Sequence, residues 1–333
     1  MLRAGVDLGG TKIQVAIVDP DGNVVGQCRI PTPQDRGPQG VIDAMVEAVR
    51  SALADAGASP SDLSGVGVGA PGQIDHDSGT VSHAGNLPDW LGTVEVAGPM
   101  RQALGVPIEL ANDVQVGVMA ESQLGAGRPY DSMLGIFCGT GVGGGIVIHD
   151  ELWLGRGAAG EVGHMVVEPD GAPCPCGRRG CLEAYAGRAA MEIKARKLVA
   201  KGRKTQLFKI MKKKERTRLS SGVWAKALEK DDDMAVQLVD RAVWALGLAA
   251  ASAVNLLDVE AVVIGGGLGC RLGTPFADRI RDAMVPHLIL PEKTPQVLSA
   301  ALGDLGGAMG AALRVEHTVP PPGPLGEVAD PDA

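Results

Sequence analysis

The apolar and polar positions of the first thirty residues predict a small unit of β-strands. In AGVDLGGTKIQVAIV, residues 4–18, two apolar runs flank a glycine turn, which is the pattern of strand, turn and strand. DPDG at 19–22 is a hairpin-turn signal, and NVVGQCRI at 23–30 has the composition of a third strand. The chain therefore opens on strands joined by tight turns.

The next part of the chain predicts both helices and strands. Residues 40–57 have the period of a helix that ends at Gly57, and LSGVGVGAPG at 63–72 predicts a buried strand that enters a loop. PIELANDVQVGVMAESQLG, residues 107–125, predicts a short strand followed by a helix. The apolar face of the first helix is formed by Val41, Met45, Val49 and Leu53.

A second unit begins near residue 133 and repeats the pattern of the first. MLGIFCGTGVGGGIVIHDELWLG, residues 133–155, again has an apolar run, a glycine turn, an apolar run and an acidic turn. Residues 188–256 are helical in pattern, 259–269 predict a buried strand ending in glycines, and helices are expected around 275–285 and 303–314. The repeat predicts two similar halves, each opening with a glycine-turned hairpin.

Composition narrows the class of protein. The 333 residues are 45% apolar and 21% charged, which is typical of soluble α/β proteins, and the net charge of −8 argues against a nucleic-acid partner. The N-terminus has no signal-peptide pattern, and no apolar stretch reaches the ~18 residues that a membrane-spanning helix needs. We expect a cytoplasmic protein whose six cysteines are thiols or metal ligands rather than disulfides.

The two glycine turns are candidates for phosphate binding. DLGGTK at 7–12 is not a Walker A loop, because the Gly-Lys-Ser/Thr order and the following helix are absent. GTGVGG at 139–144 matches G-x-G-x-x-G, but a strand pattern follows it where a dinucleotide-binding fold needs a helix. Either turn alone is equally well an ordinary tight hairpin. Glycines let backbone N–H groups approach an anion, so two such turns, with GGG at 265–267, favour a nucleotide clamped between two halves.

Polar residues beside these turns suggest how a nucleotide is held and used. Asp7 can hold Mg²⁺ through water, and Thr11 and Lys12 can meet phosphates. In ELANDV, Asn112 and Asp113 lie at a strand-to-helix junction, where either is an ordinary N-cap. Phosphoryl transfer to a hydroxyl needs one carboxylate to accept the proton, so a cap and a catalytic base are equally good interpretations of Asp113.

A histidine and three cysteines form a compact cluster in EVGHMVVEPDGAPCPCGRRGCLE, residues 161–183. One imidazole and three thiolates complete a tetrahedral zinc set, and the glycines between them allow a short chain to wrap around an ion. A redox C-x-x-C pair is absent, and three clustered thiols suit chelation better than nucleophilic catalysis. The alternative is three free thiols beside a core histidine. The four predicted ligands are His164, Cys174, Cys176 and Cys181.

Five motifs together resemble the ROK family of bacterial sugar kinases and repressors, most of all its glucokinases. They are DLGGTK at 7–12, AND at 111–113, GTGVGGG at 139–145, EVGH at 161–164 and CPCGRRGCLE at 174–183. The resemblance extends from about residue 4 to 315. It implies an α/β, actin-like ATPase fold of the hexokinase type, with two α/β domains around a central cleft. It also implies ATP and Mg²⁺ as cofactors, a structural Zn²⁺, and a hexose substrate.

The resemblance also implies roles for matching residues, with Asp113 as the general base toward the sugar 6-hydroxyl. Sugar-binding positions are Asn86, Asn112, Asp113, Glu161, His164 and Glu183. Nucleotide-binding positions are Asp7, Gly9, Gly10, Thr11, Lys12, Gly139, Thr140, Gly141, Gly265, Gly266 and Gly267. His164 is assigned to both zinc and sugar, which its two ring nitrogens allow.

The domain organisation follows from the same resemblance. We expect a small α/β domain over 1–113, with the helix at about 303–315 packed back on it, and a large domain over 114–302. The zinc-binding insertion is 161–183, and the proline- and acid-rich tail at 316–333 is expected to be disordered. A homodimer or homotetramer is implied.

Several alternatives stay open at this point. N-acetylmannosamine, N-acetylglucosamine and fructose compete with glucose as substrate, and polyphosphate competes with ATP as donor. A sugar-responsive repressor is disfavoured, because such members carry a helix-turn-helix before the motif that starts here at residue 7. Asp113 and both glycine turns argue against a non-catalytic sugar-binding protein. The basic run at 209–218 is a solvated helix face, an exposed connection or a partner site.

Overall fold

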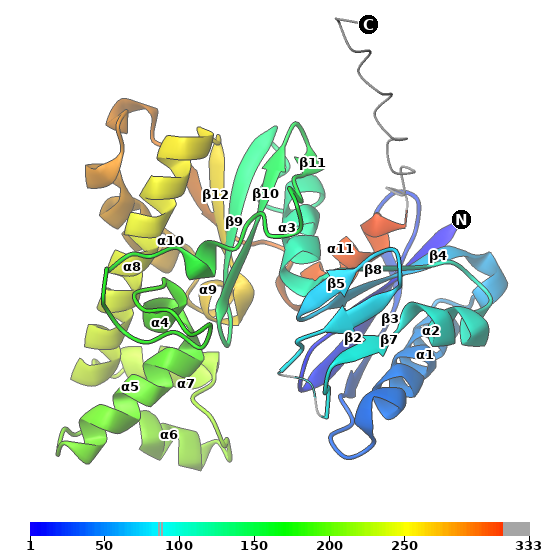
Figure 1. Ribbon diagram of the computed structural model, residues 1–333, viewed down its shortest axis with the longest axis horizontal. Coiled ribbons are helices and arrows are strands. Elements are labelled where there is room, and N and C mark those ends of the chain that lie inside the picture. Colours follow the sequence, from blue (N-terminus) through cyan, green and yellow to red (C-terminus); the bar gives the residue numbers. More distant parts are fainter. Residues whose placement is uncertain (86, 88, 316–333) are drawn as a thin grey trace, which may run out of the picture.

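The computed structural model describes residues 1–85, 87 and 89–315, and it contains two five-stranded sheets (Figure 1). The tail predicted at 316–333 lies outside the described residues. In the first sheet, β1 pairs antiparallel with β2 and parallel with β4. The spatial order of this sheet is β3 (Val24–Pro31), β2 (Lys12–Val18), β1 (Leu2–Leu8), β4 (Leu63–Ala70) and β8 (Ile108–Asn112).

The second sheet repeats this arrangement strand for strand. Strand β9 pairs antiparallel with β10 and parallel with β12, as β1 does with β2 and β4. The prediction of two similar halves, each opening with a glycine-turned hairpin, is therefore confirmed. The order is β11 (Glu151–Leu152), β10 (Val142–Ile148), β9 (Ser132–Cys138), β12 (Ala261–Gly265) and β13 (Gln296–Ser299).

Helices cover both faces of the first sheet. Successive residues of a strand point to opposite faces, so Val15 and Ile17 join the core beneath α1 (Gly37–Asp55) and α2 (Ala97–Leu104). Ala16 and Val18 face the other way, onto α11 (Gly306–Arg314). Because both faces are covered, the strands read as continuous apolar runs rather than as alternating ones.

The second half carries most of the helices. The predicted helical region at 188–256 is helical but broken into four, and the predicted strand at 259–269 ends at Gly265, because Gly266 already begins a helix. The bounds are α4 (Glu183–Ala186), α5 (Arg188–Ala200), α6 (Leu207–Lys213), α7 (Ser221–Leu228), α8 (Asp233–Leu257), α9 (Gly266–Leu272) and α10 (Thr274–Met284).

Helix α8 is the central helix of the second half. By length and composition alone it is apolar enough to cross a membrane, but 67% of its most apolar window is buried inside the protein. It packs against α10 and α4 and contributes many residues to the largest apolar cluster. The Asp232 carboxylate caps its first turn by accepting a hydrogen bond from the Ala235 N–H at 3.0 Å. We therefore interpret α8 as the core helix of a globular domain.

A third, three-stranded sheet was not predicted from the sequence. It consists of β5 (Gln73–Asp75), β6 (Thr80–Ser82) and β7 (Thr93–Glu95). Each strand has only three residues and a mixture of polar and apolar side chains, so no periodic signal distinguishes it from a loop.

Helix α3 (Asp113–Gln123) joins the two halves. Figure 1 shows α3 and α11 between the two large sheets, and α3 packs on both α11 and β10. The Glu121 carboxylate, whose residue is 2% exposed, accepts hydrogen bonds from three backbone N–H groups. The donors are Ala126 and Ala301, at 2.9 Å each, and Leu302 at 2.8 Å. This side chain ties α3 to the segment that leads into α11.

The packing of α11 depends on glycines. A Cβ added at Gly67 in β4 would lie 1.7 Å from the Ala311 carbonyl oxygen, and one at Gly310 would lie 1.8 Å from that of Val116. Both clashes are with backbone, which cannot rotate away. The helix therefore lies directly on β4 and α3 only because these positions lack side chains.

We predict that Gly67→Ala lowers the free energy of unfolding by about 1–3 kcal/mol or more, because α11 must move off the sheet. Urea denaturation measures this loss. Gly85→Ala is the matched control, since an added Cβ there meets nothing within 4 Å. Equal stability of the two variants would contradict the close packing of α11.

Candidate functional site

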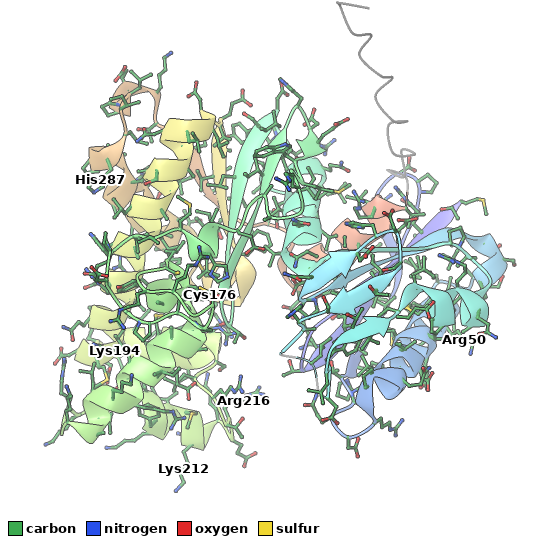
Figure 2. All side chains as sticks on the ribbon, in the orientation of Figure 1. Arg50, Cys176, Lys194, Lys212, Arg216 and His287 are labelled. Carbon is green, nitrogen blue, oxygen red and sulfur yellow. The ribbon has the colours of Figure 1, made fainter. Side chains whose placement is uncertain are left out.

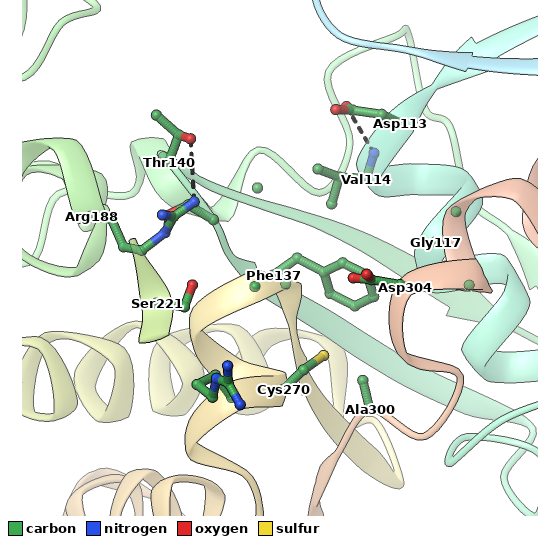
Figure 3. A pocket seen from close by; sticks show the side chains of 18 of the residues that line it. Asp113, Val114, Gly117, Phe137, Thr140, Arg188, Ser221, Cys270, Ala300 and Asp304 are labelled. Carbon is green, nitrogen blue, oxygen red and sulfur yellow. Dashed lines mark hydrogen bonds between the residues drawn. The ribbon is translucent and has the colours of Figure 1, made fainter. Parts of the chain in front are cut away.

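One cavity of about 990 Å³ collects residues from both halves. Parallel strands end at the same edge of a sheet, so the ends of β1, β8, β9 and β12 bring their following residues together. The lining includes Asp7, Asp113, Glu121, Gly139, Thr140, Gly141, Glu183, Arg188, Lys214, Arg216, Ser221, Gly266, Gly267, Cys270, Arg271 and Asp304. Figure 3 shows several of these side chains around the cavity.

The first glycine turn contributes Asp7 to this cavity but not the rest of its predicted residues. The turn is closed by a hydrogen bond from the Gly9 N–H to the Lys12 carbonyl at 2.9 Å. Thr11 and Gly10 are also absent from the lining. The Lys12 ammonium lies 3.5 Å from the Asp304 carboxylate, so it forms an ion pair. The assignment of this turn to phosphates stays a prediction.

The junction between β8 and α3 shows which of Asn112 and Asp113 caps the helix. The Asn112 side-chain oxygen accepts hydrogen bonds from the N–H groups of Val114 at 3.0 Å and Gln115 at 3.3 Å, so Asn112 is the N-cap. Asp113 is therefore the first residue of the helix and its carboxylate lines the cavity. Its Oδ1 accepts one hydrogen bond, from the Val114 N–H at 2.9 Å.

Asp7 and Asp113 have raised pKa values. Although both side chains keep some accessible surface in the cavity, protein encloses them on most sides, and this desolvation disfavours the charged form. Burial and the nearby Asp113 carboxylate raise the pKa of Asp7 to about 6. Burial likewise raises the pKa of Asp113. Two carboxyl groups with raised pKa values in one cavity are typical of a catalytic site.

The second glycine turn lies fully in the cavity. Gly139, Thr140 and Gly141 connect β9 to β10, and all three line it as predicted. The turn is closed by a hydrogen bond from the Gly139 N–H to the Gly141 carbonyl at 2.9 Å. The Glu183 carboxylate accepts a hydrogen bond from the Val142 N–H at 2.9 Å, so it is held beside this turn.

The three predicted glycines after β12 divide between strand and helix. Gly265 ends β12 and does not line the cavity, whereas Gly266 and Gly267 begin α9 and do. Residues Ser221 and Cys270 lie near them in the lining (Figure 3). This end of the cavity therefore consists of glycine backbone and the first turns of α7 and α9.

The predicted zinc ligands come together. One ligand atom each from His164, Cys174, Cys176 and Cys181 lies within 4.8 Å of every other. The Cys176 and Cys181 sulfurs are 3.7 Å apart, and His164 Nδ1 is 3.8 Å from the Cys174 sulfur. Tetrahedral zinc with Zn–S bonds of about 2.3 Å needs sulfurs about 3.8 Å apart, so these residues fit the ion. All six cysteines are free, as expected.

The zinc segment is connected to the core by a second set of contacts. The Tyr185 hydroxyl donates to Glu168, and the Arg241 guanidinium of α8 donates to the same carboxylate at 2.7 Å. Arg241 also lies over the Trp244 ring at 3.8 Å from its centroid. These contacts hold the segment against α8, and Glu183 follows directly from it.

Of the other predicted sugar ligands, the three that the structure describes, Asn112, Glu161 and His164, do not line the cavity. Glu161 is exposed and precedes a short turn that contains His164, and Asn112 also donates to the Gly72 carbonyl at 3.4 Å. Asn86 lies outside the described residues. His164 faces the cysteines through Nδ1, and the predicted contact of its other ring nitrogen with a sugar hydroxyl stays a prediction. The sugar-binding roles of these residues stay predictions.

Sequence reasoning missed four cations of the cavity, Arg188, Lys214, Arg216 and Arg271. Two of them belong to the basic run at 209–218, which we interpreted mainly as solvated surface. Figure 2 places Lys212 at the end of the helical half and Arg216 on its side toward the first half. The Lys214 ammonium donates to the Gly222 carbonyl at 3.1 Å. No motif marks these residues, because only the folded chain brings the run to the cavity.

Together these groups suit phosphoryl transfer. Glycine turns and cations accept a phosphate chain, and a buried carboxylate accepts a proton. No covalent intermediate is needed for such chemistry, since positioning and charge neutralisation supply most of the rate enhancement.

Comparison with known proteins agrees with this geometry. A glucokinase of Thermotoga maritima is 33% identical over 319 residues, which cover 95% of this chain and 97% of the relative. An N-acetylmannosamine kinase of Haemophilus influenzae is 32% identical over 316 residues, or 94% of this chain and 95% of that one.

The solved structures agree as well. The crystal structure of a ROK family glucokinase from Streptomyces griseus, in complex with glucose and AMPPNP, superposes with a TM-score of 0.78. The two sequences are 33% identical, and the alignment covers 94% of this chain and 99% of that one. The fold is thus the actin-like ATPase fold expected from the sequence. Residues 3–318 match the sequence model of the ROK family, and the chain belongs to that family.

Proposed function

We propose that the protein transfers the terminal phosphoryl group of ATP to the 6-hydroxyl of a hexose, with glucose as the preferred substrate. The observation that carries the proposal is the placement of Asp113, whose carboxylate is freed from capping by Asn112 and lies in one cavity with the Thr140 turn. Curated relatives named glucokinase and the glucose complex of the Streptomyces griseus enzyme support glucose.

In the proposed reaction, Asp113 accepts the proton of the sugar hydroxyl as its oxygen attacks phosphorus. The backbone N–H groups around Gly139–Gly141 and Gly266–Gly267 receive the phosphates and the nucleoside end. Mg²⁺ fits beside Asp7, whose carboxylate is the type of oxygen ligand that this ion prefers. When bound, Mg²⁺ would neutralise phosphate charge.

Zinc, in this proposal, has a structural role. His164 and three cysteines fill all four positions of a tetrahedral ion, so none remains for substrate. Glu183 follows Cys181 by two residues and reaches the Thr140 turn through the Val142 N–H. The metal thus fixes the segment that presents Glu183, and it supplies order rather than chemistry.

The alternative function is an N-acetylhexosamine kinase. Relatives named N-acetyl-D-glucosamine kinase and N-acetylmannosamine kinase are 30% and 32% identical to this chain. Fructose as the substrate and polyphosphate as the donor are further alternatives, which the assay described below tests. We also propose cytoplasmic localisation, where ATP and hexoses are both available, and assembly as a homodimer or homotetramer.

The first prediction concerns the base. Asp113→Asn should lower kcat for glucose phosphorylation by about 10²–10⁴-fold, because the amide cannot accept the proton, while glucose affinity changes little. A coupled ADP assay gives kcat, and calorimetry gives the affinity for glucose.

The same assay tests the substrate. Glucose, mannose, fructose, N-acetylglucosamine and N-acetylmannosamine are compared with ATP and with polyphosphate as donor. Near-normal turnover in Asp113→Asn would contradict the role of the base. If kcat/KM is higher for an N-acetyl sugar than for glucose, that sugar and not glucose is the preferred substrate.

The second prediction concerns pH. An aspartate with a raised pKa takes up its proton at a higher pH than its ordinary 3.8, and a protonated Asp113 cannot act as a base. Asp7, the proposed Mg²⁺ ligand, has a pKa of about 6, so its protonation should lower kcat/KM as the pH falls through about 6, and protonation of Asp113 should lower it further. Initial rates between neutral and acid pH measure this limb, and full activity down to pH values near 4 would exclude it.

The third prediction concerns zinc. Cys176→Ser should lower the bound zinc, the midpoint of thermal unfolding and the affinity for sugar together. We expect the KM for glucose to rise by about tenfold, the usual effect of losing one hydrogen bond to a charged group. Metal analysis, calorimetry and rate measurements give the three quantities.

Cys28→Ser is the matched control, because Cys28 lies on β3 in the other half of the molecule. If a zinc-free Cys176→Ser protein bound sugar with unchanged affinity, the proposal that zinc positions the sugar site would be wrong.

A further inference from the structure

The cations around the cavity differ in their surroundings. Lys12, which the sequence placed at the phosphates, pairs with Asp304 and does not line the cavity. Lys214, Arg216 and Arg271 line it but are exposed to solvent. Among the described residues that line the cavity, Arg188 is the one half-buried cation.

The Arg188 guanidinium is held at the tip of the β9–β10 hairpin. Its Nε donates to the Gly139 carbonyl at 3.0 Å, and one terminal nitrogen lies 3.5 Å from the Thr140 hydroxyl oxygen (Figure 3). The backbone of the same region is tied down too, because the Ala189 N–H donates to the Thr140 carbonyl at 3.0 Å. The side chain is therefore positioned before any ligand binds.

Its partners in the structure are neutral. A guanidinium has five N–H donors, and these two contacts use two of them. Within the described ranges, no carboxylate lies within ion-pairing distance of Arg188, although Asp7, Asp113 and Glu183 line the same cavity. Desolvation by burial lowers the pKa of Arg188, yet a guanidinium stays charged at every physiological pH. The Glu192 carboxylate acts on Arg188 electrostatically, but it is paired with Arg196. A half-buried cation whose hydrogen-bond partners are neutral favours a bound anion.

We infer that Arg188 is a catalytic residue that binds the phosphoryl group in transfer, beside the Thr140 turn, and neutralises its charge. This inference rests on the proposed kinase function. In the step, the bond from the sugar 6-oxygen to the γ-phosphorus forms while the bond to the bridging oxygen of ADP breaks. The hydroxyl proton goes to Asp113, and the electron pair of the broken bond goes to ADP.

Charge neutralisation explains the choice of arginine better than bracing of the hairpin does. Bracing a carbonyl and a hydroxyl needs two ordinary donors, which a lysine or glutamine can supply. The planar guanidinium adds a second pair of N–H groups that matches two oxygens of one phosphoryl group. It does so where solvent is partly excluded, so its charge is screened less than that of the exposed Lys214.

The test compares Arg188→Ala and Arg188→Lys with Arg196→Ala. Arg196 lies on the same helix and does not line the cavity, but it pairs with Glu192, which acts electrostatically on Arg188. Lys194→Ala, on the exposed face of that helix, is therefore measured beside it and is the matched control. Arg188→Ala should lower kcat with ATP and glucose by about 10²–10³-fold, as loss of one transition-state donor does. The KM for glucose should stay unchanged, and lysine should restore only part of the rate.

Chemical rescue separates catalysis from bracing. Millimolar guanidinium chloride, far below denaturing concentration, should raise the rate of Arg188→Ala but not that of Arg188→Lys or of the unsubstituted enzyme. A kcat of Arg188→Ala within about threefold of the unsubstituted enzyme overturns the inference. A loss without rescue, together with a lower unfolding midpoint, assigns Arg188 to bracing and overturns it as well. Failure of the proposed function itself is visible separately, as inactivity of the unsubstituted protein with every sugar.

Discussion

The close approach of α11 to β4 and α3 is the constraint on which the rest of the structure depends. It exists because Gly67 and Gly310 present backbone where other residues would present a side chain. Helix α3 carries Asp113 at its first residue, and Glu121 ties its other end to the segment before α11. The orientation of Asp113, the proposed base, is therefore set by packing between the halves, and a change that moves α11 also moves Asp113.

Electrostatics in the cavity follow from this arrangement. Asp7 of the first half and the carboxylates of α3 meet cations of the second half, which come from α5, from α9 and from the segment that follows α6. Glu183, at the start of α4, adds one carboxylate from the second half. In the proposed reaction, a phosphate chain would pair with the cations and Mg²⁺ with the carboxylates. Burial, and after it the nearby Asp113 carboxylate, raises the pKa of Asp7.

Much of the fold was predictable from local pattern. The two hairpins, the buried strands and the zinc cluster each have a signal within a short stretch of sequence, and the structure contains all of them. The β5–β7 sheet has strands too short for a period, and the end of β12 was misjudged because glycine occurs both at strand ends and at helix starts. Arg188, Lys214, Arg216 and Arg271 were missed for another reason: their meeting depends on tertiary packing. The predicted domain boundaries and sugar ligands stay predictions.

The two sheets have the same strand order, but their connections differ, and the connection between the third and fourth strands differs most in length. Between its third and fourth strands, the first half has a single long helix, α1, whereas the second half has the cysteine cluster and α4 to α8 at the corresponding place. Glu183, Arg188 and Lys214 all come from that connection. The molecule thus contains two sheets of the same strand order, and the connection between the third and fourth strands is much longer in the second half. Because these three residues line the cavity, sequence changes in that connection can alter the cavity while the strand order of both sheets stays the same.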